Sequence, residues 1–218
     1  MTGLVPNRLL FDFEFPLRYR AQTPILTGRL ADWTDDYRLP DLSPLDGQTA
    51  FGSMWACWNE RGIAIACRVT GRRTPLSCDP ARFWRGDNLR LCTDMRDTRG
   101  VKRATRYCQQ FYFLPIGAGR DGKAPAAASA PIQRAGQPAP AVPPSRIKIA
   151  ARVLKSSYAL EAHIPADALS GFDPAEHRRI GFYYMLEDTG LGQQYLTVGD
   201  PLYWYVDPST WATAVLTD

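Results

Sequence analysis

A tryptophan, a tight turn and an alternating strand follow one another in the segment Phe83-Trp84-Arg85-Gly86-Asp87-Asn88-Leu89-Arg90-Leu91-Cys92-Thr93-Asp94. From Asn88 onward polar and apolar side chains alternate, which predicts a strand with one face in a core and the other face outside it. The indole of Trp84 stands just before this strand. Two interpretations of Trp84 stay open: a ring that covers the end of the core, or a flat platform that receives a ligand.

The same alternation recurs along most of the chain and favours an all-β protein. Strands are predicted at residues 9–16, 51–58, 63–69, 89–94, 107–114, 146–153, 158–164, 180–186, 195–198 and 211–216, with one helical turn at 165–169. No segment is long enough for the crossover helices of a parallel α/β fold, and no repeat of 20–50 residues suggests a propeller. We therefore expect an antiparallel β-sandwich of the jelly-roll or immunoglobulin type.

The segment 116–145 differs from the rest because it is dominated by alanine, proline and glycine. It shows neither the period of a helix nor that of a strand, and it has little apolar surface to offset the entropy of ordering it. We predict a long mobile excursion here. Because alternation resumes at residue 146, we expect residues 1–218 to form a single domain.

Composition limits the class of partner and the compartment. The chain has 26 Lys and Arg against 22 Asp and Glu, a net charge of +4, which predicts no nucleic-acid partner. No stretch approaches the ~20 apolar residues of a membrane span, so no membrane partner is expected either. Charged residues interrupt the first twenty positions, which favours a cytoplasmic protein, or an extracellular one if a leader was removed. The oligomeric state is not predicted.

The five cysteines lack the spacing of a zinc site, and we expect free thiols. They are Cys57, Cys67, Cys78, Cys92 and Cys108.

Catalytic machinery is not evident, and we expect no enzyme. No Gly-x-Ser-x-Gly motif is present, and the two histidines, His163 and His177, are both predicted to lie at the surface. Carboxylates for glycoside hydrolysis would have to come from Asp87, Asp94, Glu161 and Asp188, which are scattered over separate elements.

The order of several short motifs resembles that of the family 9 carbohydrate-binding modules, a DOMON-like group of β-sandwich domains. The motifs are Gly28-Arg29-Leu30-Ala31-Asp32-Trp33, Phe51-Gly52-Ser53-Met54-Trp55, Gly62-Ile63-Ala64-Ile65, Trp84-Arg85-Gly86-Asp87-Asn88-Leu89, Tyr158-Ala159-Leu160-Glu161-Ala162-His163-Ile164-Pro165, Ile180-Gly181-Phe182 and Asp207-Pro208-Ser209-Thr210-Trp211. The resemblance covers residues 24–216.

The resemblance implies non-catalytic binding of a polysaccharide chain end between two aromatic faces. Trp84 matches the first face. The candidate for the second face is Trp204, which has Tyr203 and Tyr205 beside it, and the alternative is Trp211. Polar groups at the edge of the sugar would be Arg90, Asn88 and Arg106. Where the family commonly has an acidic side chain this chain has Arg90, which favours an acidic or more oxidised sugar.

The resemblance leaves three further interpretations open. Structural calcium occurs in such modules, and Asp94, Asp97 and Asp188 are its candidate ligands, although salt bridges explain these acids equally well. A related sandwich binds haem for electron transfer, for which the chain offers Met54, Met95, Met185, His163 and Lys102. A sandwich with exposed aromatic side chains also serves as a protein-interaction module.

Overall fold

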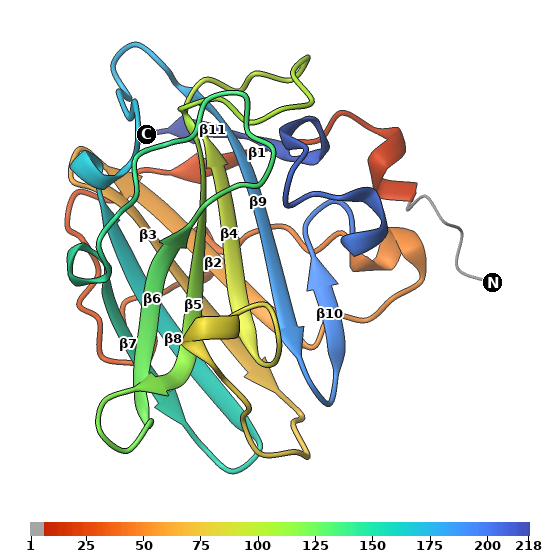
Figure 1. Ribbon diagram of the computed structural model, residues 1–218. Coiled ribbons are helices and arrows are strands. Elements are labelled where there is room, and N and C mark those ends of the chain that lie inside the picture. The colour runs from red at the N-terminus through yellow and green to blue at the C-terminus, as the bar shows by residue number, and fades with distance from the viewer. Residues whose placement is uncertain (1–6) are drawn as a thin grey trace.

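Two β-sheets lie face to face in the computed structural model, which describes residues 7–218 (Figure 1). The larger, seven-stranded sheet has the order β1-β11-β9-β4-β5-β6, with β10 paired to β9. Its strands are β1 (Glu14–Arg18), β4 (Asn88–Asp94), β5 (Cys108–Ala118), β6 (Ala124–Ala130), β9 (Arg179–Asp188), β10 (Gly192–Tyr195) and β11 (Ala212–Thr217). The smaller sheet has the order β2-β3-β8-β7. Its strands are β2 (Gly52–Asn59), β3 (Gly62–Thr70), β7 (Lys148–Val153) and β8 (Ser157–Pro165).

Neighbouring strands are antiparallel except for one pair, the parallel β1 and β11 near the two ends of the chain. The helices that the structure describes are short 3₁₀ turns. They are η1 (Asn7–Leu10), η2 (Asp35–Tyr37), η3 (Ser43–Asp46), η4 (Pro80–Arg82), η5 (Pro144–Arg146), η6 (Ala166–Ala168), η7 (Asp200–Leu202) and η8 (Pro208–Thr210). No helix within residues 7–218 is long and apolar enough to cross a membrane. The predicted antiparallel β-sandwich is confirmed.

The main core lies between the sheets because each strand turns alternate side chains inward. Ile63 and Ile65 of β3 and Leu89 and Leu91 of β4 are fully buried in it. A smaller cluster lies on the outer face of the four-stranded sheet, where Trp33 packs on Trp55 and its neighbours.

The segment 28–33, the first motif of the resemblance, is held in place by the buried side chain of Glu161 in β8. Its carboxylate accepts hydrogen bonds from the backbone N–H of Thr27 (2.8 Å) and from Trp33 Nε1 (3.1 Å), and also from the N–H of Gly28. Gly28 has a φ of +73°, and a Cβ there would lie 2.6 Å from the backbone of Ala151 in β7. Glycine is therefore required where this segment crosses the edge strand.

Three predictions about elements were wrong. The short strand predicted at 195–198 lies earlier in the chain, as β10 (Gly192–Tyr195). Residues 124–130 form the edge strand β6, which pairs with β5, within the segment 116–145 that was expected to lack regular structure. The rest of that segment also packs on the protein: Ile132 and Val142 are buried, and the N–H of Gly136 donates to the carbonyl of Ala104 (2.9 Å). At the start of the chain a 3₁₀ turn takes the place of the first half of the predicted strand, and β1 begins only at Glu14.

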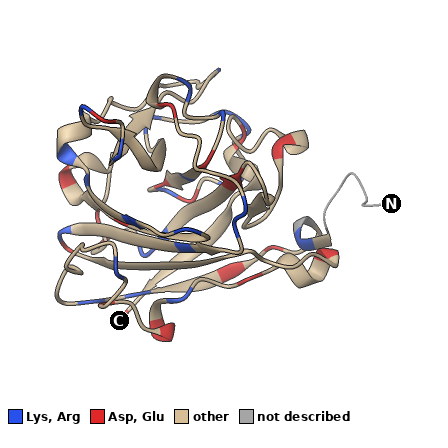
Figure 2. Ribbon diagram, turned by 90° about the horizontal axis from the view of Figure 1, so that it is seen from below, with Lys and Arg blue, Asp and Glu red and all other residues tan. Residues whose placement is uncertain are grey.

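Charged residues of both signs occur throughout the sequence. Figure 2 shows Lys and Arg interspersed with Asp and Glu over the ribbon rather than gathered on one element.

Candidate ligand-binding site

A cavity of about 460 Å³ opens over the outer face of β4 and β5, where three loops meet. Its volume falls in the range of ~300–1,000 Å³ typical of small-molecule sites. The residues that line it are Phe83, Trp84, Arg90, Gln110, Ala130, Pro131, Gln133, Asp200 and Tyr205.

The floor of this cavity is polar. Arg90 of β4 and Gln110 of β5 lie on neighbouring strands and are 5% and 6% exposed. Strand alternation places them there, because Leu89 and Leu91 on either side of Arg90 point into the core. The floor therefore follows from the pattern that predicted the strand.

Trp84 forms one wall, and its side chain is 49% exposed. Its ring meets Phe83 edge to face (centroids 5.3 Å apart, planes at 89°), and Phe83 stacks on Tyr112 (4.3 Å, 7°). Tyr112 pairs in register with Arg90. The indole is thus carried by a stack of rings on the sheet, and it presents a face to solvent instead of only closing the core.

The loop that carries Trp84 is fixed at its base by Gly86 and Asp87. Gly86 has a φ of +110°, and a Cβ there would lie 2.2 Å from the carbonyl oxygen of Ser77. The N–H of Asp87 donates to that carbonyl (2.7 Å), and the N–H of Ser77 donates to Asp87 Oδ2 (2.6 Å). These reciprocal bonds require the close approach that only glycine permits.

A buried ion cluster ties this base to both sheets. Arg72, just after β3, pairs through Nη2 with Asp87 Oδ2 (3.0 Å) and through Nε with Asp188 at the end of β9. All three side chains are nearly fully buried. Asp87 also accepts hydrogen bonds from Thr189, and Asp188 from the N–H groups of Gly190 and Leu191 (2.9 and 3.0 Å), so neutral donors complement the single cation.

The opposite wall comes from the segment 199–211, which contributes Tyr205 and Asp200 to the cavity. Tyr205 is half-buried and packs edge to face on Trp204 (5.6 Å, 87°). Tyr203, 60% exposed with a φ of +53°, does not line the cavity.

The prediction that Trp204 or Trp211 offers a stacking face is corrected by their burial. Trp204 is 0% exposed: its ring stacks on Tyr183 (4.6 Å, 20°), and the guanidinium of Arg90 lies 4.8 Å from its centroid. Trp211 is 3% exposed and donates through Nε1 to the carbonyl of Trp204 (2.8 Å). Neither ring has a free face for a ligand, and the aromatic residue of this segment that lines the cavity is Tyr205.

The Trp204 stack is also held by polar contacts at its edges. Trp204 Nε1 donates to Asp200 Oδ1 (2.9 Å), and the hydroxyl of Tyr183 donates to the carbonyl of Val198 (2.6 Å). Burial raises the pKa of Tyr183 well above its ordinary value, so this phenol stays protonated as a donor.

Arg90 is already paired with an acid. Its Nη2 lies 2.5 Å from Glu187 Oε2 and 3.0 Å from the sulfur of Met185, while its Nε is buried without a hydrogen-bond partner. Asp200 adds a second negative charge at the cavity. Arg90, Glu187 and Asp200 together carry a formal charge of −1, so the preference for an acidic sugar that Arg90 alone suggested loses its electrostatic support.

The remaining predicted ligand residues lie outside the cavity. Asn88 is fully buried and donates through Nδ2 to the carbonyl of Gly86 (2.8 Å), so it shapes the turn. Arg106 donates to the hydroxyl of Tyr107 (2.8 Å) and lies over that ring. Of the predicted set, the structure brings together Trp84, Arg90 and Tyr205.

Sequence reasoning missed Gln110, Gln133 and Asp200. A signal existed for Gln110, because Phe111 and Phe113 mark the core face of its strand and leave Gln110 on the other. Gln133 and Asp200 lie outside regular strands, where no period indicates which side chain points inward.

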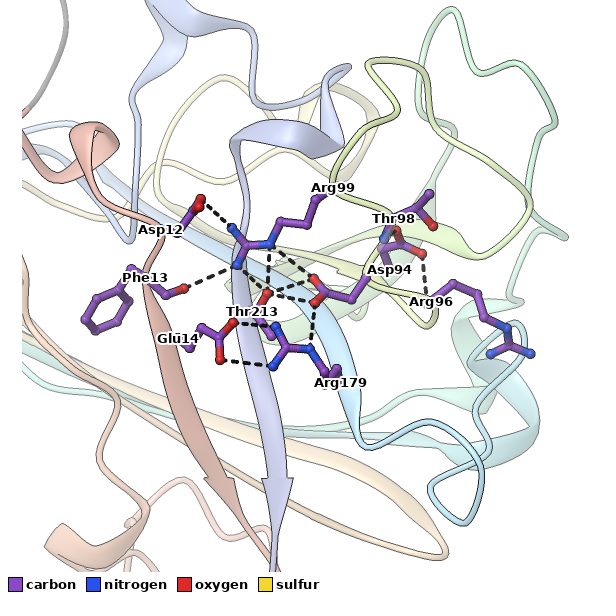
Figure 3. Close-up of polar contacts among 10 residues, drawn as sticks. Asp12, Phe13, Glu14, Asp94, Arg96, Thr98, Arg99, Arg179 and Thr213 are labelled. Atoms are coloured by element: carbon purple, nitrogen blue, oxygen red, sulfur yellow. Dashed lines mark hydrogen bonds and ion pairs between the residues drawn. The ribbon is translucent and has the colours of Figure 1, made fainter.

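Protein groups contact the carboxylates of the candidate calcium ligands, and Figure 3 shows this for Asp94. Asp94 accepts hydrogen bonds from the N–H of Arg96 (3.0 Å) and of Thr98 (2.7 Å). Asp97 accepts from Thr213 Oγ1 (2.8 Å) and pairs with Arg99 and Arg179, while Asp188 pairs with Arg72. Among residues 7–218 no three His, Cys, Asp or Glu side chains are grouped as metal ligands. For Asp97 and Asp188 these contacts match the salt-bridge explanation, while Asp94 is held by backbone hydrogen bonds.

The side chains considered for haem are not gathered at the cavity. Met54, Met95 and Met185 are core residues, and none of them lines it. His163 lies on β8 opposite Lys148 and is 8% exposed, so its predicted surface position was wrong. Burial lowers the pKa of His163, and the charge of Lys148 lowers it further.

No family model matches the sequence, and no curated protein matches it. Solved structures do match the fold. A family 9 carbohydrate-binding module from Caldicellulosiruptor kristjanssonii matches in its glucose complex (TM-score 0.64, 12% identity, 94% of this chain and 95% of that chain) and in its cellotriose complex (TM-score 0.62, 12% identity, 94% of each chain). A proposed carbohydrate-binding protein from Bacteroides uniformis also matches (TM-score 0.54, 12% identity, 94% and 99%). The chain therefore has the fold of a family 9 carbohydrate-binding module.

Proposed function

We propose that this protein is a non-catalytic carbohydrate-binding domain that holds a sugar ring, at the end of a saccharide chain, in the cavity between Trp84 and Tyr205. The observation that carries the proposal is that aromatic rings from two separate loops line one cavity over a polar floor. A pyranose offers apolar C–H faces to such rings and hydroxyl groups around its rim.

The polar residues of the cavity suit those hydroxyl groups. Arg90 only donates hydrogen bonds, Asp200 only accepts them, and the amides of Gln110 and Gln133 do both. Because a sugar hydroxyl is both donor and acceptor, a lining of this kind can satisfy it. The carboxylate that the family commonly presents from the β4 position would come here from Asp200.

The fold likeness supports the same class of ligand by analogy. The two matching complexes of the C. kristjanssonii module contain glucose and cellotriose. Neutral gluco-oligosaccharides are therefore the first ligands to test.

A protein-interaction module is the second candidate, because Tyr203 and Trp84 are strongly exposed. A protein partner would favour a flat aromatic patch. Trp84 and Tyr205 instead line a hollow with a buried cation in its floor, which favours a small ligand.

The test is a titration followed by tryptophan fluorescence, with gluco-, xylo- and uronic-acid oligosaccharides, each beside its reduced alditol. We expect a saturable change with a neutral series, lost when the chain end is reduced. A change that survives reduction would retain sugar binding and contradict binding of the reducing end. No response to any series would overturn the proposal in favour of the interaction module.

A further inference from the structure

Asp200 is held in one orientation at the edge of the cavity. Its Oδ1 accepts from Trp204 Nε1 and its Oδ2 from Gln193 Nε2, each at 2.9 Å. Trp204 is fully buried, so the first donor is immobile. Each carboxylate oxygen still has a lone pair for a ligand hydroxyl.

The charge of Asp200 is not neutralised within the cavity. Both of its hydrogen-bond donors are neutral, and the only cation in the lining, Arg90, is paired with Glu187 at 2.5 Å. Arg82 and Arg85 belong to the Trp84 loop but are exposed and do not line the cavity, and Arg82 pairs with Asp79. Solvent screens such exposed charges more strongly than those inside a cavity.

The floor nevertheless has an unused donor. Arg90 is 5% exposed, and its Nε is buried without a partner. This Nε has almost no accessible surface, so a ligand oxygen reaches it only if the guanidinium shifts, and a carboxylate there would enter a site whose formal charge is already −1. A hydroxyl or ring oxygen satisfies the same donor without that repulsion.

From this arrangement we infer that Asp200 contacts the ligand and makes the cavity select uncharged sugar rings over sugar acids of the same ring stereochemistry. The inference rests on the proposed function. The selection comes from Asp200, the first residue of η7, and it reverses the preference that Arg90 alone would suggest.

The experiment compares matched ligands by titration calorimetry near neutral pH. The pairs are glucose with glucuronate, galactose with galacturonate and mannose with mannuronate, which differ only at C6. For the pair whose neutral member binds, we expect the uronate to bind at least about tenfold more weakly, which corresponds to about 1.4 kcal/mol.

Asp200→Asn is the decisive variant because it removes the charge and keeps the shape. The amide oxygen can still accept from Trp204, and the amide of Gln193 can turn over to face the new NH₂ group. We expect the ratio of the uronate Kd to the neutral-sugar Kd to fall to about threefold or less, mainly through tighter uronate binding. Asp121→Asn is the matched control, because Asp121 is exposed and outside the cavity lining, and it should leave the ratio unchanged.

A second measurement does not depend on the folding of the variant. Raising the salt from about 0.02 M to about 0.5 M should strengthen uronate binding to the unmodified protein and leave the neutral sugar unaffected. Uronate binding as tight as the neutral sugar would overturn the inference, as would an unchanged ratio in a folded Asp200→Asn protein that still binds the neutral sugar. In both cases the proposed function stands. It fails, and the inference with it, if no sugar binds.

Discussion

Two adjacent aromatic residues, Trp204 and Tyr205, have opposite environments in this protein. Trp204 is fully buried between Tyr183 and Arg90, while Tyr205 lines the cavity. The family resemblance selected Trp204, because the second aromatic face of such modules lies shortly before the closing Pro208-Ser209-Thr210-Trp211 motif. The segment is irregular and passes through a left-handed residue at Tyr203, so no period indicates which ring faces the ligand.

Substitution to alanine separates these roles. Trp84→Ala should abolish sugar binding with little effect on the melting temperature, because that ring is 49% exposed. Trp204→Ala should lower the free energy of unfolding by about 3–5 kcal/mol because it empties a packed site. Thermal melts and the fluorescence titration measure both. A Trp84→Ala protein that fails to fold would show that Trp84 belongs to the core.

His163 should make stability depend on pH. Its lowered pKa means that the folded state binds the proton less readily than the unfolded state, where the value is near the ordinary 6.5. The contribution of neutral His163 to the free energy of unfolding is complete above pH 6.5 and is lost as the pH falls toward the lowered pKa. Denaturant unfolding measures the free energy of unfolding at about pH 7.5 and about pH 5.5. Between these two values the free energy should fall less for His163→Gln than for the unmodified chain. Equal losses in both would contradict this.

At the scale of elements, the strands supply the floor of the site and the loops supply its walls. The strands that carry Arg90 and Gln110 were predictable, since apolar and polar side chains alternate along both. Strand β6 could not be predicted, because its sequence is almost all alanine and shows no alternation. It is a strand because it pairs with β5. The first half of the strand predicted at 9–16 failed for the opposite reason: alternation was present, but the partner β11 pairs with β1 only from Glu14 onward.

The buried ion cluster of Arg72, Asp87 and Asp188 should stabilise both the fold and the loop that carries Trp84. Arg72→Met would leave Asp87 and Asp188 buried without their cation, which should cost about 3–5 kcal/mol of unfolding free energy. Because Asp87 anchors the loop, sugar affinity should fall as well. Arg73→Met removes an adjacent arginine that pairs with no described residue, and it should change neither quantity measurably. Equal stability of the two variants would refute the anchoring role.

At the scale of the whole molecule, the two sheets share one core, which contains Cys67, Cys92 and Cys108, while Cys57 lies in the smaller cluster on the outer face of the four-stranded sheet. Cys57, Cys67, Cys92 and Cys108 are buried, and Cys78 is half-buried. Burial raises the pKa of Cys57 and of Cys67 to about 12 and that of Cys78 to about 11, so the reactive thiolates are scarce at neutral pH.

Thiol labelling therefore reports on global unfolding. In the folded protein we expect Cys78 to react first and the four buried cysteines only at the rate of cooperative opening. An aromatic disulfide reagent, added along a denaturant series, measures this. Fast labelling of the buried set under native conditions would show that the two sheets do not form one cooperative unit.

The most direct test of the sugar site is calorimetric titration of the unmodified protein, Trp84→Ala, Tyr205→Ala and the control Phe11→Ala with one neutral oligosaccharide. Phe11 is an exposed aromatic residue that does not line the cavity. We predict one site per chain, loss of binding in both cavity variants, and unchanged binding in the control. Binding that survives both cavity substitutions would place the ligand elsewhere and contradict the account.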